Sequence, residues 1–251
     1  MAAETGELVM DPLVTGPLDL LAIAAHPDDI EQTCGGTVLR AAEAGYRTGI
    51  LDLTAGDMGT RGTPELRIAE SQKAARILQV EWRDNLRFPD ARLENSLPGR
   101  MTLAQKIREL RPRVVIIPYW EARHPDHYRA GELAYEACFL AGLKKIDPYT
   151  EPHRPFKIIY ACQYANVTPT FVVDITGQFD RRMESLLAYQ SQYGPVDAGG
   201  DLFPAETEIR ERLAAIARFY GNLIGVKYGE AFVQKETMRV DDVVALPVRS
   251  L

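Results

Sequence analysis

The chain of 251 residues has an ordinary globular composition, with 46% hydrophobic and 25% charged residues, and its length suits one α/β domain. Its 29 Lys and Arg against 35 Asp and Glu give a net charge of −6, which excludes a broad basic face for nucleic acid or anionic membrane. No apolar run approaches the roughly 20 residues of a membrane span, and the acidic start lacks the features of a secretory signal. Three widely spaced cysteines indicate reduced thiols rather than a disulfide framework. We therefore expect a cytoplasmic protein without a nucleic-acid or membrane partner.

Apolar runs that predict strands alternate with amphipathic segments that predict helices. The first 17 residues are polar and predict a flexible N-terminal extension to a single domain over residues 18–251. The strands expected in the first half of the chain are Leu18–Ala25, Arg47–Thr54, Glu81–Phe88 and Arg113–Tyr119. The helices expected after them are the segment from Gly35 to Gly45, Pro64–Val80, Leu103–Leu110 and Arg129–Leu143. This alternation predicts a three-layer, Rossmann-like, mostly parallel sheet with helices on both faces.

The second half of the chain breaks the alternation. Two apolar runs, Lys157–Tyr164 and Thr170–Ile175, are separated by a segment too short for a crossover helix, so we expect additional antiparallel or edge strands here. Two further helices are predicted over Asp180–Tyr189 and Glu206–Tyr220. The α/β domain is therefore expected to carry additional C-terminal strands and helices.

Two short motifs follow the ends of predicted strands. AHPDDIE, residues 25–31, follows the first strand, and RHPDH, residues 123–127, follows the fourth. Three of the four histidines of the chain lie in these two motifs. Because ligands of open α/β sheets bind beyond the carboxyl ends of the strands, the two motifs are expected to face each other across one crevice.

The residue types in the motifs match a mononuclear metal site. His26 and Asp29 are three residues apart and His127 adds a third donor from the second motif. Two imidazoles and one carboxylate leave a coordination position open, which is typical of a catalytic zinc site rather than a structural one. We expect one Zn²⁺ per chain, with Fe²⁺ as the alternative ion. Taken alone, each His-Pro-Asp has an ordinary interpretation as a strand end followed by a helix cap, but the pair favours a metal site.

The remaining motif residues suit hydrolysis. Asp28 lies beside a predicted ligand and is the candidate general base for a water molecule. His124 is the candidate donor to the developing oxyanion, with Asp126 holding it protonated. The pattern therefore predicts metal-assisted hydrolysis of an acyl bond. A non-haem Fe(II) oxygenase and a non-catalytic metal- or sugar-binding protein are the alternatives from other classes.

AHPDDIE followed by GGT, with HPDH about a hundred residues later, resembles the LmbE-like (PIG-L type) zinc-dependent N-acetylglucosamine deacetylases. The likeness runs from about residue 18 to about residue 233. Further segments resemble the bacillithiol-biosynthesis branch, whose members deacetylate N-acetylglucosaminyl-malate. These are ILDLTAGDMGTRGTPELRIAESQKAARIL, RFPDARL, RHPDHYRAGELAYEACFLAGL, FVVDIT, AYQSQY and IGVKYGEAF.

The resemblance implies the same metal ligands and catalytic residues, and it adds two substrate-binding residues. It implies that Arg67 binds substrate and that Asp90 accepts hydrogen bonds from sugar hydroxyls. By residue type alone, an exposed helix residue is the favoured interpretation of Arg67, and Asp90 could equally be a turn residue after Pro89. Arg61, in the loop 56–62, is a further candidate for an anionic substrate group. The segment 197–208 offers no counterpart of the substrate-facing tyrosine of the branch.

The resemblance predicts an N-acetylglucosaminide as the small-molecule substrate, with the malate glycoside as the first candidate. Another N-acetyl sugar, a chito-oligosaccharide or a thiol-conjugate amide are the alternatives. We also expect a homo-oligomer.

Overall fold

The computed structural model describes residues 16–162, 166–194 and 206–248. Most of the predicted N-terminal extension and most of the segment 197–208 lie outside these ranges. Among the helices of the described ranges, none combines the length and apolarity that crossing a membrane requires.

A seven-stranded sheet forms the centre of the molecule, with the strand order β3-β2-β1-β4-β5-β7-β6. The pairs β1–β2, β2–β3, β1–β4 and β4–β5 are parallel, and β7 is antiparallel to both of its neighbours. The strands are β1 (Leu20–Ala24), β2 (Thr48–Thr54), β3 (Trp82–Phe88), β4 (Val114–Pro118), β5 (Lys157–Ala161), β6 (Phe171–Asp174) and β7 (Gly229–Val233). The predicted α/β class with a mostly parallel sheet is confirmed.

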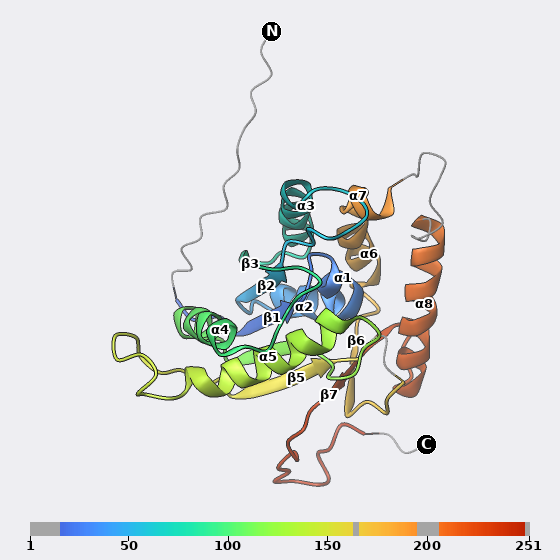
Figure 1. Ribbon diagram of the computed structural model, residues 1–251. Coiled ribbons are helices and arrows are strands. Elements are labelled where there is room, and N and C mark those ends of the chain that lie inside the picture. The colour runs from blue at the N-terminus through green and yellow to red at the C-terminus, as the bar shows by residue number, and fades with distance from the viewer. Residues whose placement is uncertain (1–15, 163–165, 195–205, 249–251) are drawn as a thin grey trace.

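Helices cover both faces of this sheet (Figure 1). They are α1 (Asp29–Thr33), α2 (Gly35–Glu43), α3 (Pro64–Ile77), α4 (Leu97–Leu110), α5 (Pro125–Ala141), α6 (Phe179–Leu187), α7 (Gln190–Tyr193) and α8 (Glu206–Leu223). Alternate residues of β1 point to opposite faces: Ile23 packs in the core with α4 and α5, and Ala24 in the core with α2 and α3. All five residues of β1 are buried, as its nearly continuous apolar run predicts.

The C-terminal part of the sheet differs from the prediction in one strand. The edge position of β6 is as expected, but β5 is parallel to β4, because α5 provides the crossover between them. β7 was not predicted, and it lies between β5 and β6. Glu230 of β7 contacts the start of α2, although the two segments are far apart in the sequence. Its carboxylate accepts hydrogen bonds from the backbone N–H groups of Gly36 and Thr37, at 2.9 and 2.7 Å. These are N–H groups that the first turn of α2 leaves unpaired.

Both motifs lie at helix starts. α5 begins at Pro125, four residues before the predicted start, because Pro suits the first helical position and the His124 ring caps the helix by accepting from the N–H of Asp126. α1 begins at Asp29, directly after β1. Since β1 and β4 are adjacent, and the strand order reverses between them, the motifs meet at the topological switch point of the sheet.

Candidate metal centre and active site

The side chains of His26, Asp29 and His127 converge, as predicted from the motifs. One possible donor atom from each lies within 4.8 Å of the others. Asp29 Oδ1 lies 3.2 Å from His127 Nε2, and Asp29 Oδ2 lies 3.4 Å from His26 Nδ1. His26 and Asp29 are buried and His127 is half-buried. The loop after β1, which carries His26, and the first turns of α1 and α5 therefore bring two imidazoles and one carboxylate to a single point.

These distances fit a divalent ion. Two donors about 2.1 Å from a tetrahedrally coordinated zinc are roughly 3.4 Å apart, close to both Asp29 distances. The other nitrogen of the His26 ring, Nε2, faces carboxylates, with Asp90 Oδ1 at 3.0 Å and Asp126 Oδ2 at 3.5 Å. An imidazole with one nitrogen toward the ion and the other on a carboxylate is typical of metal ligands. The donor set suits zinc in both chemistry and spacing.

A second possible donor set shares one residue with the first. His26, His124 and Asp126 also offer donor atoms within 4.8 Å of one another. The three imidazoles form a cluster, with ring centroids 4.9–5.4 Å apart. Asp126 Oδ1 is buried and accepts no hydrogen bond from the described part of the chain. The site as a whole is therefore rich in carboxylate oxygens directed at a small volume.

Asp28 points away from this donor set although it is the sequence neighbour of Asp29. Its backbone is left-handed, with φ 98°, a conformation that costs a non-glycine residue about 1–3 kcal/mol. Tyr193 donates a hydrogen bond to Asp28 Oδ2 at 2.7 Å, and Arg67 Nη2 lies 3.3 Å from Oδ1. Burial raises the pKa of Asp28 to about 6, although Arg67 and Tyr193 act in the opposite direction. This is the environment of a carboxylate that can exchange a proton near neutral pH.

Arg67 and Asp90, the residues that the resemblance assigns to substrate, have partners within the protein. Arg67 is buried rather than exposed, and its guanidinium also donates to the carbonyl groups of Pro27 and Gly56. Gly56 leaves the room for it, since a Cβ there would lie 1.9 Å from Arg67 Nη1. Asp90 accepts a hydrogen bond from the N–H of Met58 at 2.8 Å in addition to its contact with His26. Both side chains thus contact residues of the first motif: Arg67 contacts Pro27 and Asp28, and Asp90 contacts His26.

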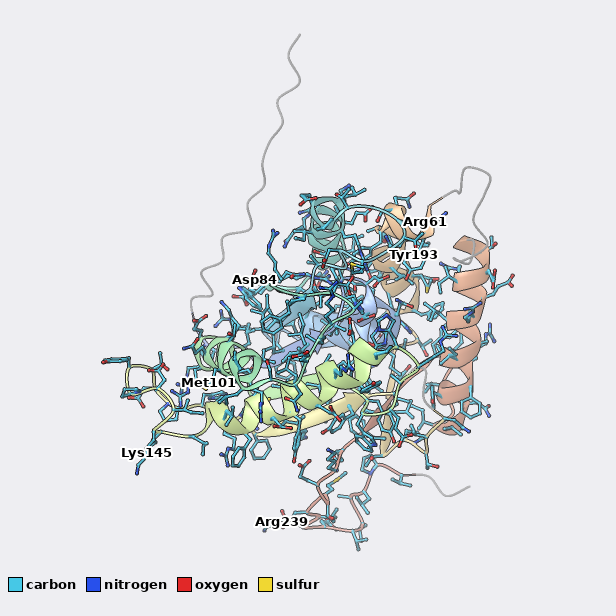
Figure 2. The ribbon with its side chains drawn as sticks, in the orientation of Figure 1. Arg61, Asp84, Met101, Lys145, Tyr193 and Arg239 are labelled. Carbon is cyan, nitrogen blue, oxygen red and sulfur yellow. The ribbon has the colours of Figure 1, made fainter. Side chains whose placement is uncertain are left out.

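Arg61 lies in the loop between β2 and α3, which reaches across to α7. Its Nη1 donates to the carbonyl of Gln192 at 2.9 Å, and its own carbonyl accepts from the Gln192 amide at 2.9 Å. Figure 2 shows Arg61 and Tyr193 near each other where this loop meets α7. The loop therefore adjoins the helix that supplies the tyrosine to Asp28.

The surroundings of His124 lower the pKa of its ring. Its Nδ1 accepts from the N–H of Asp126 at 3.2 Å, so the proton of the neutral ring is on Nε2. Burial and the positive charges of His26 and His127 lower the pKa of His124, and Asp126 opposes them only in part. The Asp126 carboxylate instead contacts His26 and accepts from the N–H of Ala91 at 2.7 Å. The Asp126 carboxylate is therefore directed at His26, and its role in holding His124 protonated stays a prediction.

A buried ionic network lies next to the site and was not anticipated from the sequence. Arg83 of β3 contacts Glu31 at 2.5 Å and Asp52 at 2.9 Å, and all three side chains are buried. Tyr189 donates to the same Glu31 oxygen at 3.2 Å. Because Glu31 belongs to α1, this network holds the helix that carries Asp29. Glu31 belongs to the first motif, and Tyr189 and Tyr193 belong to the segment AYQSQY, but nothing in these sequences indicates the contacts with Arg83 and Asp28.

The three cysteines are free and buried. Burial raises the pKa of Cys138 and of Cys162 to about 12. Burial likewise raises the pKa of Cys34, which lies at the junction of α1 and α2. Buried thiols with a raised pKa carry little thiolate near neutral pH, which disfavours a nucleophilic role.

Known proteins resemble this chain in both fold and sequence. Residues 21–138 match the model of the PIG-L family, described as GlcNAc-PI de-N-acetylase. Diacetylchitobiose deacetylase of Thermococcus kodakarensis is 30% identical over 226 residues, which cover 84% of this chain and 80% of that protein. The chain belongs to the PIG-L family. It is therefore a deacetylase, a hydrolase that acts on an amide bond, and metal-dependent removal of acetyl groups from N-acetyl sugars is the chemistry of the PIG-L family.

Two solved structures and one further relative define its place in the PIG-L family more closely. The conserved protein TT1542 from Thermus thermophilus is 42% identical with a TM-score of 0.80, covering 89% of this chain and 98% of that one. N,N'-diacetylchitobiose deacetylase from Pyrococcus horikoshii, complexed with its inhibitor MPG, is 28% identical with a TM-score of 0.74, covering 85% and 82%. The probable N-acetyl-alpha-D-glucosaminyl L-malate deacetylase 2 of Bacillus anthracis is 29% identical over 69% of this chain and 81% of that protein. The family is thus confirmed, whereas the bacillithiol branch is no nearer than the chitobiose deacetylases.

Proposed function

We propose that this protein removes the acetyl group of an N-acetylglucosaminide, using one divalent ion, zinc in the first instance and Fe²⁺ as the alternative, held by His26, Asp29 and His127. The observation that carries the proposal is the convergence of these three side chains beside a separate buried carboxylate, Asp28. A site that only binds a metal does not need the second carboxylate.

When bound, such an ion polarises the amide carbonyl and lowers the pKa of water. Asp28 accepts the proton of the attacking water and later returns it to the nitrogen of the leaving amine as the C–N bond breaks. Arg67 and Tyr193 hold the Asp28 carboxylate in place through its two oxygens. His124 donates from Nε2 to the carbonyl oxygen as negative charge develops there. The products are acetate and a free amino sugar.

Asp90 and Asp126 serve as positioning residues in this proposal. Their carboxylates face His26 Nε2, which fixes the orientation of the ring that presents the other nitrogen to the metal. Arg61 and the exposed loop residues beside it adjoin α7 and remain our candidates for contacts with the aglycone.

The malate glycoside of N-acetylglucosamine is our first candidate substrate, supported by the segments that resemble the bacillithiol branch and by the relative from Bacillus anthracis. Diacetylchitobiose is the second candidate, supported by the relative from Thermococcus kodakarensis, which matches a larger share of this chain. A comparison of kcat/KM for N-acetylglucosamine, its malate glycoside and diacetylchitobiose distinguishes them. Equal values for the first two would remove the malate assignment.

The chemistry is tested by metal analysis together with release of free amine. We expect about one zinc per chain, with His127→Ala losing both zinc and activity and Asp28→Asn losing activity alone. Full activity in Asp28→Asn would refute the proposed base. Stoichiometric zinc without amine release from any N-acetyl sugar would instead favour a binding protein.

A further inference from the structure

An apolar pocket opens beside the proposed metal ligands. Its space for the centres of water-sized groups is about 50 Å³, which is room for about four of them, and Asp29 and His127 are among its lining residues. It extends from them along the carboxyl ends of β1, β4 and β5 and the side of α1. Its position at the switch point of the sheet is where an α/β fold binds small molecules.

The wall of the pocket is hydrophobic. Its buried part is formed largely by Ile23, Ile30, Ile117, Ala161 and Cys162. Two polar side-chain atoms in the wall already have partners: Thr33 Oγ1 donates to the carbonyl of Asp29 at 2.7 Å, and Cys162 Sγ to that of Tyr160 at 3.2 Å. Glu121, a further charged lining residue, is exposed. The interior therefore suits a hydrocarbon and would leave sugar hydroxyls without partners.

The polar groups of the site lie elsewhere. Asp28, Arg67 and Asp90 are not among the residues that line the pocket, whereas the ligands Asp29 and His127 are. With an amide carbonyl placed beside these two ligands, its acyl carbons would face the hydrophobic wall. An acetyl group contributes a single methyl, which fills only part of the space for about four water-sized groups.

We propose that this pocket receives the acyl chain of the substrate and that the protein hydrolyses N-acylglucosaminides with acyl groups longer than acetyl. The proposal rests on the proposed function for the position of the scissile amide. Each added methylene that enters the pocket is buried from water, which is worth about a fourfold gain in affinity.

The test begins with equilibrium binding of the product carboxylates to the zinc-loaded protein. Calorimetry with acetate, butyrate and hexanoate is expected to show a Kd that falls about fourfold per methylene. In the same preparation, release of free amine is expected to be at least as fast, as kcat/KM, from N-butyrylglucosamine as from N-acetylglucosamine. A flat series of Kd values, or butyryl hydrolysis more than tenfold slower than acetyl hydrolysis, would overturn the proposal.

Variants in which a larger side chain fills the pocket provide a second test. Ala161→Leu, with Ala161→Val as the milder form, is expected to bring the ratio of hexanoate to acetate affinity close to one at unchanged zinc content. Ala44→Leu, at an exposed position after α2, controls for the added side chain and should keep the wild-type ratio. Persistence of that ratio in both Ala161 variants would overturn the proposal. A clear chain-length gain without turnover of any N-acylglucosamine would contradict the proposed function and leave the pocket assigned.

Discussion

Removing the hydroxyl of Tyr193 tests how the proposed base is held. The hydroxyl donates to Asp28 Oδ2 at 2.7 Å in a buried environment. A hydrogen bond to a charged group contributes about 1.5–3 kcal/mol. If Asp28 depends on it throughout the reaction, Tyr193→Phe lowers kcat/KM about 10- to 150-fold. Since the hydroxyl is bonded to Asp28 rather than to a metal donor, the zinc content should not change.

The assay is release of free amine from N-acetylglucosamine by the zinc-loaded protein, with metal analysis of the same sample. Tyr160→Phe is the matched control, because Tyr160 is also buried and its hydroxyl has no hydrogen-bond partner within the described ranges. We expect the control to keep wild-type activity. A kcat/KM of Tyr193→Phe within threefold of wild type would refute the reasoning, and so would a loss of zinc.

Three further perturbations follow from the packing around the site. Gly56→Ala should abolish most activity, because the added Cβ would lie 1.9 Å from Arg67 Nη1. Gly45→Ala is the control, since Gly45 has φ 86° and open space around it. This variant should lose only about 1 kcal/mol of stability and keep its kcat/KM. Arg83→Met should lower the free energy of unfolding by about 3–5 kcal/mol in urea titrations, since it leaves two buried carboxylates without their cation; a change below 1 kcal/mol would contradict this. Because burial raises the pKa of the Cys34 and Cys138 thiols, a thiol reagent at pH 8 should label neither of them in the native protein and both in denaturant. Fast labelling of either cysteine in the native protein would show that it is accessible.

The sequence predicted the convergence of the three candidate metal donors because the physics involved is local. An apolar run buried on both faces predicts a parallel strand, and parallel strands present their carboxyl ends at one edge. His26 and His127 follow two such strands, so their meeting needed only adjacency of β1 and β4. The start of α5 was predicted four residues too late. From the sequence, the capping role of His124 cannot be distinguished from a role as a catalytic residue.

Other parts of the site depend on contacts between distant segments. Tyr193 reaches Asp28 across 165 positions of sequence, and only the position of α7 against α3 and the loop after β2 makes this possible. Arg67 lies in a helix of weak amphipathicity, and its burial depends on the space at Gly56 rather than on its own neighbours. Arg83 lies in the predicted strand Glu81–Phe88, but no pattern within that strand indicates that it pairs with Glu31.

The position of β7 has a consequence for how the chain folds during its synthesis. β6 pairs only with β7 among the described strands, and Glu230 lies 194 residues from the helix start that it caps. During synthesis, β6 must therefore wait for residues 229–233 to leave the ribosome, and until then the edge of β5 stays open to pairing with other molecules. A nonsense mutation shortly before Gly229 would consequently yield aggregates rather than a shortened but functional enzyme.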